Sequence, residues 1–148
     1  MPSTYTVLRC HIVFATKHRE KFIHSRWETQ LHRFLGGCLR QSDCLPIEIG
    51  GTEDHVHLLT GFSPVHRLSD LVGDLKSASS RWIRNSLGIP NFRWQEGYAA
   101  VSVSAMEMEK LRIYIKGQRE HHRRVSFLDE YRALLEKVGL ELDERFLP

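Results

Sequence analysis

Two histidines separated by one residue form the strongest chemical pattern in this sequence. His55 and His57 lie in the run Asp-His-Val-His-Leu-Leu at residues 54–59. Side chains of a β-strand alternate between its two faces, so a strand here would project both histidines from one face. Two imidazoles in that arrangement can bind one divalent metal through their ring nitrogens. Because two ligands are too few for a tight site, a third ligand must come from elsewhere in the chain.

A tyrosine and a glutamine four residues apart form the second pattern. Helical spacing over residues 105–122 would place Tyr114 and Gln118 on one face, with His121 one turn further on. Each of these residues also has an ordinary explanation. A tyrosine beside an apolar helical stripe usually packs in a core, and the pair His121-His122 would suit a solvated helix end, where imidazolium is favourable. Only the combination with the two strand histidines points to a shared site.

The hydrophobic pattern predicts the elements that would position these residues. Alternating or β-branched runs predict strands, and apolar residues at three- and four-residue spacing predict helices. Two of the helices would begin with capping boxes, one at Ser25 with Glu28 and one at Ser104 with Glu107. The predicted strands lie at residues 5–17, 46–49, 54–62 and 92–103, and the predicted helices begin at residues 25, 68, 105 and 126.

This order is β-α-β-β-α-β followed by two helices. It is the split β-α-β arrangement of the ferredoxin-like and RRM-like folds. We therefore predict an α+β protein with an antiparallel sheet and both core helices on one face. The other face would be left for the C-terminal helices, for a partner or for a ligand.

The bulk composition indicates a soluble protein of one domain. The chain has 148 residues, of which 41% are hydrophobic and 26% charged. No apolar run approaches the ~20 residues needed to cross a bilayer, and the N-terminus lacks a signal-peptide pattern, so we expect a cytoplasmic protein with no membrane contact. The net charge of +3 does not by itself indicate nucleic-acid binding. Three cysteines without C-x-x-C spacing predict neither a disulfide framework nor a structural zinc site.

Taken together, these segments resemble the single-tyrosine HUH transposases, the IS200-like transposases of short insertion sequences. His-Val-His at residues 55–57 matches the family's histidine motif, and Tyr-Ile-Lys-Gly-Gln at residues 114–118 matches its tyrosine motif. The resemblance covers nearly the whole chain, so residues 1–148 are expected to form one HUH endonuclease domain. Three further segments resemble the family's first strand, the helix that follows the histidine motif and the stretch before the last strand: residues 10–17, residues 68–71 with 76–80, and residues 94–98.

The resemblance implies a role for each motif residue. Tyr114 would be the catalytic nucleophile, and His55, His57 and Gln118 would be the metal ligands. The implied metal is Mg²⁺ or Mn²⁺, although two imidazoles and an amide oxygen would bind zinc or nickel at least as well. The implied reaction is cleavage and rejoining of single-stranded DNA with hairpin ends, through a 5′-phosphotyrosine intermediate, by a homodimer. Candidates for DNA contacts are Lys17, Arg19, Lys21, Lys76, Arg81, Arg84 and His121.

Two other functions fit parts of the pattern. A non-catalytic or domesticated nucleic-acid-binding module could use an RRM-like sheet, but the retained metal and nucleophile set argues against it. A metal-dependent hydrolase would activate water and would not need Tyr114. The phenol of a tyrosine has an ordinary pKa of ~10, so its proton must be taken up, and the sequence offers only His121 as a weak candidate for that base.

Overall fold

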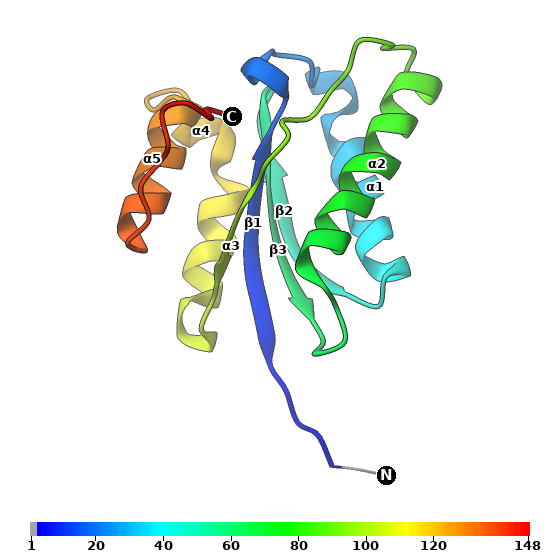
Figure 1. The fold of residues 1–148 in the computed structure, drawn as a ribbon. Helices are drawn as coiled ribbons and strands as arrows, with labels where there is room; N and C mark the ends of the chain where they lie inside the picture. The colour runs from blue at the N-terminus through cyan, green and yellow to red at the C-terminus, as the bar shows by residue number, and fades with distance from the viewer. Residues whose placement is uncertain (1–2) are drawn as a thin grey trace.

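A four-stranded antiparallel sheet forms the centre of the computed structural model, which describes residues 3–148. The spatial order of the strands is β2-β3-β1-β4. This order, with one helix after β1 and one after β3, confirms the predicted ferredoxin-like arrangement (Figure 1). The strands are β1 (Leu8–Ala15), β2 (Leu45–Gly51), β3 (His55–Phe62) and β4 (Ala99–Ser102).

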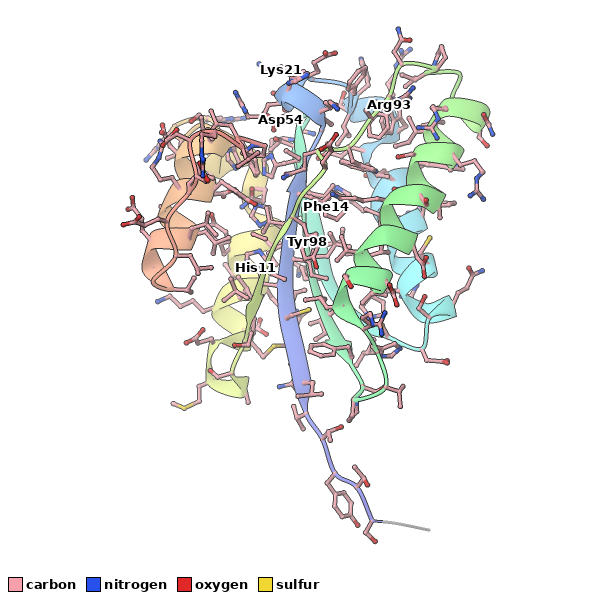
Figure 2. The ribbon with its side chains drawn as sticks, in the orientation of Figure 1. His11, Phe14, Lys21, Asp54, Arg93 and Tyr98 are labelled. Atoms are coloured by element: carbon pink, nitrogen blue, oxygen red, sulfur yellow. The ribbon has the colours of Figure 1, made fainter. Side chains whose placement is uncertain are left out.

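Two long helices cover one face of the sheet (Figure 1). The alternation of side chains along β1 explains this packing. Phe14 is fully buried in the core that the sheet forms with these helices, whereas His11 projects to the opposite side of the strand (Figure 2). Val56 and Leu58 of β3 enter the same core, so the histidines between and before them face away from it. The two helices are α1 (Ser25–Gln41) and α2 (Leu68–Ser86).

The C-terminal helices cover the other face of the sheet (Figure 1). Val13 and Ala15 of β1 form a second, smaller apolar cluster there with Phe127, Tyr131 and Leu135. Of the three possible occupants of this face, the C-terminal helices, a partner or a ligand, the structure therefore shows the C-terminal helices. These helices are α3 (Met108–Lys116), α4 (Gln118–His121) and α5 (Phe127–Lys137), and two short 3-10 helices are η1 (Lys17–Arg19) and η2 (Ala105–Glu107). Within residues 3–148, no helix combines the length and the apolar character that crossing a membrane would need.

Both predicted capping boxes are wrong. The residue before α1 is His24, whose Nδ1 accepts a hydrogen bond from the backbone N–H of Arg26, so Ser25 is already helical. At the second position, Ser104 precedes the 3-10 helix η2 and makes no side-chain capping bond. The later prediction of a helix start at Ser126 is confirmed, because its hydroxyl accepts from the N–H of Asp129 and caps α5.

Two predicted elements are shorter than expected. The helix expected over residues 105–122 is divided into η2, α3 and α4, and the last break falls at Gly117, which caps one helix and precedes the next. The strand expected over residues 92–103 pairs regularly only in β4. Its earlier part follows the end of β1 through isolated contacts, among them the bridge between Thr16 and Trp94.

Candidate active site

Strand β3 presents His55 and His57 side by side on the face that the C-terminal helices cover. Their side chains are almost completely buried. The His55 Nδ1 lies 2.7 Å from Oδ1 of Asp54, and the carboxylate of Asp54 keeps a pKa below its ordinary value, so His55 donates there. The Nδ1 of His57 lies 2.7 Å from Nε2 of His11. Partners on Nδ1 of this kind fix the orientation of each ring and turn Nε2 towards the site.

Helices α3 and α4 bring the tyrosine motif against these histidines. The Gln118 side chain is 1% exposed, and its Oε1 lies 2.8 Å from Nε2 of His55. This approach depends on Gly50 of β2, where an added Cβ would lie 2.3 Å from the carbonyl oxygen of Ile115. The glycine therefore lets α3 pack closely on the sheet and sets the depth at which Tyr114 and Gln118 reach the histidines.

The Tyr114 hydroxyl reaches the same group of side chains from within its own chain. It donates a hydrogen bond to Oε2 of Glu130, and its oxygen lies 3.5 Å from Nε2 of His121. Glu130 also accepts from the amide of Gln118 at 3.0 Å, through the same oxygen. Tyr114, His55, His57 and Gln118, which the sequence proposed as one site, are thus brought together.

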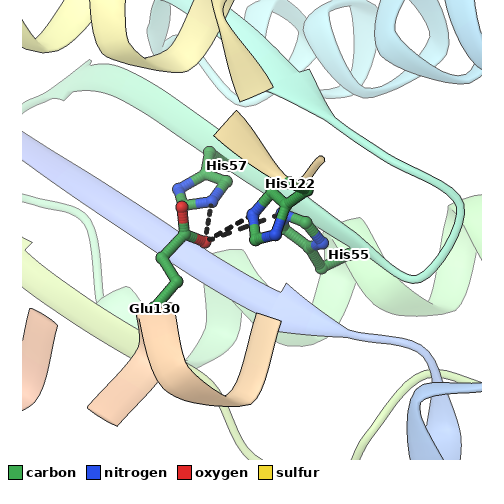
Figure 3. A group of neighbouring side chains, drawn as sticks. All are labelled: His55, His57, His122 and Glu130. Atoms are coloured by element: carbon green, nitrogen blue, oxygen red, sulfur yellow. Dashed lines mark hydrogen bonds and ion pairs between the residues drawn. The ribbon is translucent and has the colours of Figure 1, made fainter. Parts of the chain in front are cut away.

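Sequence reasoning missed Glu130 and His122. Glu130 comes from α5 and is 5% exposed, and its Oε1 lies 2.9 Å from Nε2 of His57 and 3.2 Å from Nε2 of His122 (Figure 3). The interpretation of the His121-His122 pair as a solvated helix end is wrong for His122, whose side chain is only 9% exposed. A usable signal existed for Glu130: it falls between Phe127 and the other apolar residues on the inner face of α5, where a lone carboxylate needs a partner.

Burial sets the protonation states of the site. It lowers the pKa of His57 to about 4 and that of His11 to about 3, despite the nearby charge of Glu130. Burial alone would raise the pKa of Glu130, but hydrogen bonds from His122, His57 and Tyr114 hold it far below its ordinary value. Burial and then the bond to Glu130 raise the pKa of Tyr114. At neutral pH the site therefore holds an ionised carboxylate, a protonated tyrosine and neutral His57, and a neutral imidazole is the form that binds metals.

The arrangement of donor atoms around His55 fits a cation. His55 donates through Nδ1 to Asp54, and His122 places Nδ1 2.6 Å from the carbonyl oxygen of Val125. Both rings therefore direct Nε2 inwards, towards Oε1 of Gln118 at 2.8 and 2.9 Å. Burial lowers the pKa of His122, but its hydrogen bond to Glu130 outweighs burial and raises it, so a proton on this ring holds the group together without a metal. Two imidazole nitrogens and an amide oxygen that converge in this way fit a divalent metal, which would take the place of that proton.

A cleft of about 580 Å³ gives access to the site from outside. It lies between α3, α5 and the β4 segment, and its inner end is formed by His57, Tyr114 and Glu130. Lys110 and His121 contribute polar groups to its walls. Its size is within the range of small-ligand pockets, and Tyr114 is among the residues that line it.

The residues proposed for DNA contacts fall into separate regions. Those in and beside η1 lie at the end of the sheet where β3 begins, and Figure 2 shows Lys21 and Asp54 together at that end. Lys76 on α2 donates to the backbone oxygens of Gln95 and Gly97 at 2.7 and 2.5 Å, which ties it to its own chain. His121 lies inside the site. The η1 group consists of Lys17, Arg19 and Lys21, and the α2 group, which lies across the sheet from Tyr114, consists of Lys76, Arg81 and Arg84.

Comparison with known proteins gives a consistent result. The family described as IS200-like transposases matches residues 4–118. The ISDra2 transposase TnpA of Deinococcus radiodurans is 26% identical over 121 residues, which cover 76% of this chain and 85% of that protein. The transposase for insertion sequence element IS200 of Salmonella typhimurium is 29% identical over 120 residues, which cover 74% of this chain and 76% of that protein.

Two solved structures share the fold. One is a Deinococcus radiodurans protein described as a transposase, with a TM-score of 0.65 and 27% identity, covering 80% of this chain and 95% of that one. The other is a REP-associated tyrosine transposase bound to a REP hairpin, with a TM-score of 0.62 and 12% identity, covering 84% of this chain and 74% of that one. Since the family match extends over most of its length, the chain belongs to the family of IS200-like transposases.

Proposed function

We propose that this transposase cleaves and rejoins single-stranded DNA at insertion-sequence ends through a covalent bond to Tyr114. His55, His57 and Gln118 would hold the divalent metal, Mg²⁺ or Mn²⁺. One observation carries the proposal: the Tyr114 hydroxyl and Nε2 of His57 contact the two oxygens of the same Glu130 carboxylate at the inner end of one cleft. A nucleophile and a metal ligand that contact the same carboxylate are close enough to act on one phosphate.

The chemistry follows from the groups in the cleft. The Tyr114 oxygen attacks the scissile phosphorus, its proton passes to Oε2 of Glu130, and the bond from phosphorus to the 3′-oxygen breaks. The 3′-oxygen takes up a proton from water and leaves as a hydroxyl, while Glu130, a weak base because of its low pKa, returns the tyrosine proton to water. A metal held beside the tyrosine supplies Lewis-acid polarisation of the non-bridging phosphate oxygens. The phosphotyrosyl bond keeps the energy of the phosphodiester, so a 3′-hydroxyl can later displace Tyr114 and rejoin the strand without ATP.

The substrate and assembly are proposed from the family. A related transposase has been solved with a REP hairpin bound, which supports a hairpin-bearing DNA end as the substrate here. The chain carries one nucleophile of this kind, and excision of an element requires cuts at two ends, so we propose a homodimer with two sites. Residues 1–148 would act as one HUH domain, and its reaction on DNA would take place in the cytoplasm.

Covalent trapping tests the proposal. Wild type and Tyr114→Phe are incubated with labelled single-stranded DNA from the element's ends, with Mn²⁺ or with EDTA, and resolved on denaturing gels. We expect a protein–DNA adduct that requires both the metal and Tyr114. Tyr5, which is exposed and remote from the cleft, provides the matched control as Tyr5→Phe, and this variant should form the adduct at the wild-type level.

The alternative function is a non-catalytic or domesticated nucleic-acid-binding module. The same gels separate the two functions. Tight binding of the correct end sequence without any adduct would favour the binding module. Cleavage that persists in Tyr114→Phe would instead indicate a hydrolase that activates water.

A further inference from the structure

The site contains more potential metal ligands than the three that the family motifs supply. His122 and Glu130 contribute one atom each to a group whose ligand atoms all lie within 4.8 Å of one another, together with His55 and His57 (Figure 3). The oxygen of Gln118 lies inside the same group, 2.9 Å from Nε2 of His122. Gln118 therefore adds a fifth potential donor atom beside the four of this group.

The spacing of these atoms suits a six-coordinate ion. Ligands at about 2.1 Å from a metal in octahedral geometry lie ~3 Å apart when adjacent and ~4 Å apart when opposite. The observed distances from Oε1 of Glu130 are 2.9 Å to His57, 3.2 Å to His122 and 3.7 Å to His55. Five protein donors would leave one position for a phosphate oxygen of the DNA.

The hydrogen bonds around the two additional residues favour ligation over a purely structural role. His122 donates from Nδ1 to the carbonyl oxygen of Val125, which directs Nε2 towards Gln118 and Glu130. Glu130 bonds Tyr114 and Gln118 through Oε2 and turns Oε1 to the three imidazoles. In the metal-free protein a proton must sit between these acceptors, and a metal ion can take its place.

The charge and ligand types point to the kind of metal. The three motif ligands are neutral, so they offer no compensation for a buried divalent charge, whereas Glu130 supplies one negative charge. Three imidazoles favour Mn²⁺ and later transition metals over Mg²⁺, which prefers oxygen ligands and retains its water.

We propose that His122 and Glu130 complete the metal site of this chain as a third imidazole ligand and a carboxylate ligand, and that the completed site takes Mn²⁺ in preference to Mg²⁺. This inference rests on the metal site in the proposed function. Both residues lie beyond residue 118, where the family match ends, so the ligands come from this chain's own C-terminal segment. Because Oε2 of the same carboxylate accepts the bond from Tyr114, the ligand would also fix the distance from metal to nucleophile.

Direct metal binding tests the inference without any DNA. Isothermal titration of the metal-free protein with Mn²⁺ is compared for wild type, Glu130→Gln, Glu130→Ala and His122→Ala. Loss of a ligand should weaken binding by about tenfold or more for each variant, with Glu130→Ala the most affected. Glu136→Gln is the matched control, because Glu136 is exposed on the same helix α5 and its loss should leave the affinity unchanged. Circular dichroism without metal verifies that each variant keeps its fold.

Two outcomes overturn the inference. A variant of Glu130 or His122 that binds Mn²⁺ as well as Glu136→Gln does excludes that residue as a ligand. A wild-type dissociation constant for Mg²⁺, measured by the same titration, that is equal to or lower than the one for Mn²⁺ refutes the preference for Mn²⁺.

The titration and the trapping experiment can fail separately. If the adduct forms in a Tyr114-dependent way but the Glu130 and His122 variants bind metal normally, only the further inference fails. If these variants lose metal affinity while wild type forms no adduct, the ligand assignment holds and the proposed reaction fails.

Discussion

Replacing Gly50 by alanine should move the tyrosine helix without touching any site residue. An ideal Cβ at this position would lie 2.3 Å from the carbonyl oxygen of Ile115 and 2.9 Å from its Cγ2. Ordinary contact begins near 3.4 Å, so the backbone of α3 must retreat by about 1 Å. Overpacking of this kind costs about 1–3 kcal/mol of stability.

The displacement acts directly on the chemistry because Tyr114 precedes Ile115 and Gln118 follows it by less than one turn. A misplacement of about 1 Å can cost roughly 10²-fold in rate. We therefore expect Gly50→Ala to form the DNA adduct about 10²-fold more slowly than wild type. Single-turnover trapping on denaturing gels measures this rate, and a thermal melt measures the accompanying loss of stability.

Gly37→Ala provides the control for this experiment. Gly37 lies in α1, and a Cβ there would meet no atom within 4 Å. Alanine is a better helix former than glycine by up to about 1 kcal/mol, so this variant should melt at the same or a higher temperature and keep the wild-type rate. A folded Gly50→Ala protein with the wild-type rate would refute the argument that close packing on β2 sets the position of the nucleophile.

Three further predictions concern the support of the site. Ser126→Ala removes the N-terminal cap of α5 and should lower the free energy of unfolding by about 1 kcal/mol. Hydrogen-exchange mass spectrometry should show faster amide exchange in α5, and unchanged exchange would show that the cap is dispensable. In EDTA, the free energy of unfolding should fall as the pH drops from about 6.5 to 4, by up to about 1.4 kcal/mol per pH unit for each of His11 and His57. The reason is that these two histidines bind protons in the unfolded chain but stay neutral when buried in the folded protein. Chemical unfolding at several pH values gives the slope, and His11→Gln should make it less steep. Arg119→Met should cost about 1 kcal/mol by leaving the mostly buried Glu28 without its partner, and the double variant with Glu28→Gln should recover part of this loss in a thermal melt.

The sequence predicted the fold well where periodicity controls packing. Alternation along a strand put His55 and His57 on one face, and the same rule explains why His11 and Phe14 lie on opposite faces of β1. The four-residue spacing of Tyr114 and Gln118 survives the helix break at Gly117, since both side chains still donate to the same oxygen of Glu130.

The remaining features depend on tertiary contacts that no local pattern contains. Whether α5 turns Glu130 into the site depends on how the helix docks on the second face of the sheet, and its 3.6-residue period does not fix that docking. The first capping box failed because His24 offered a ring nitrogen one residue earlier, while Glu28 pairs with Arg119 from α4 instead. The proton acceptor in the proposed reaction is Glu130, so the same dependence on docking hid it from the sequence.

The order of the site residues along the chain has a consequence for protein synthesis. The four strands and both long core helices are complete by Ser102, so the sheet and its histidines emerge from the ribosome first. Tyr114, Gln118, His122 and Glu130 all follow within one C-terminal stretch. A product of premature termination before α3 would contain the residues of the sheet and the paired histidines but not Tyr114. In the proposed reaction such a product, which lacks Tyr114, would form no covalent bond to DNA.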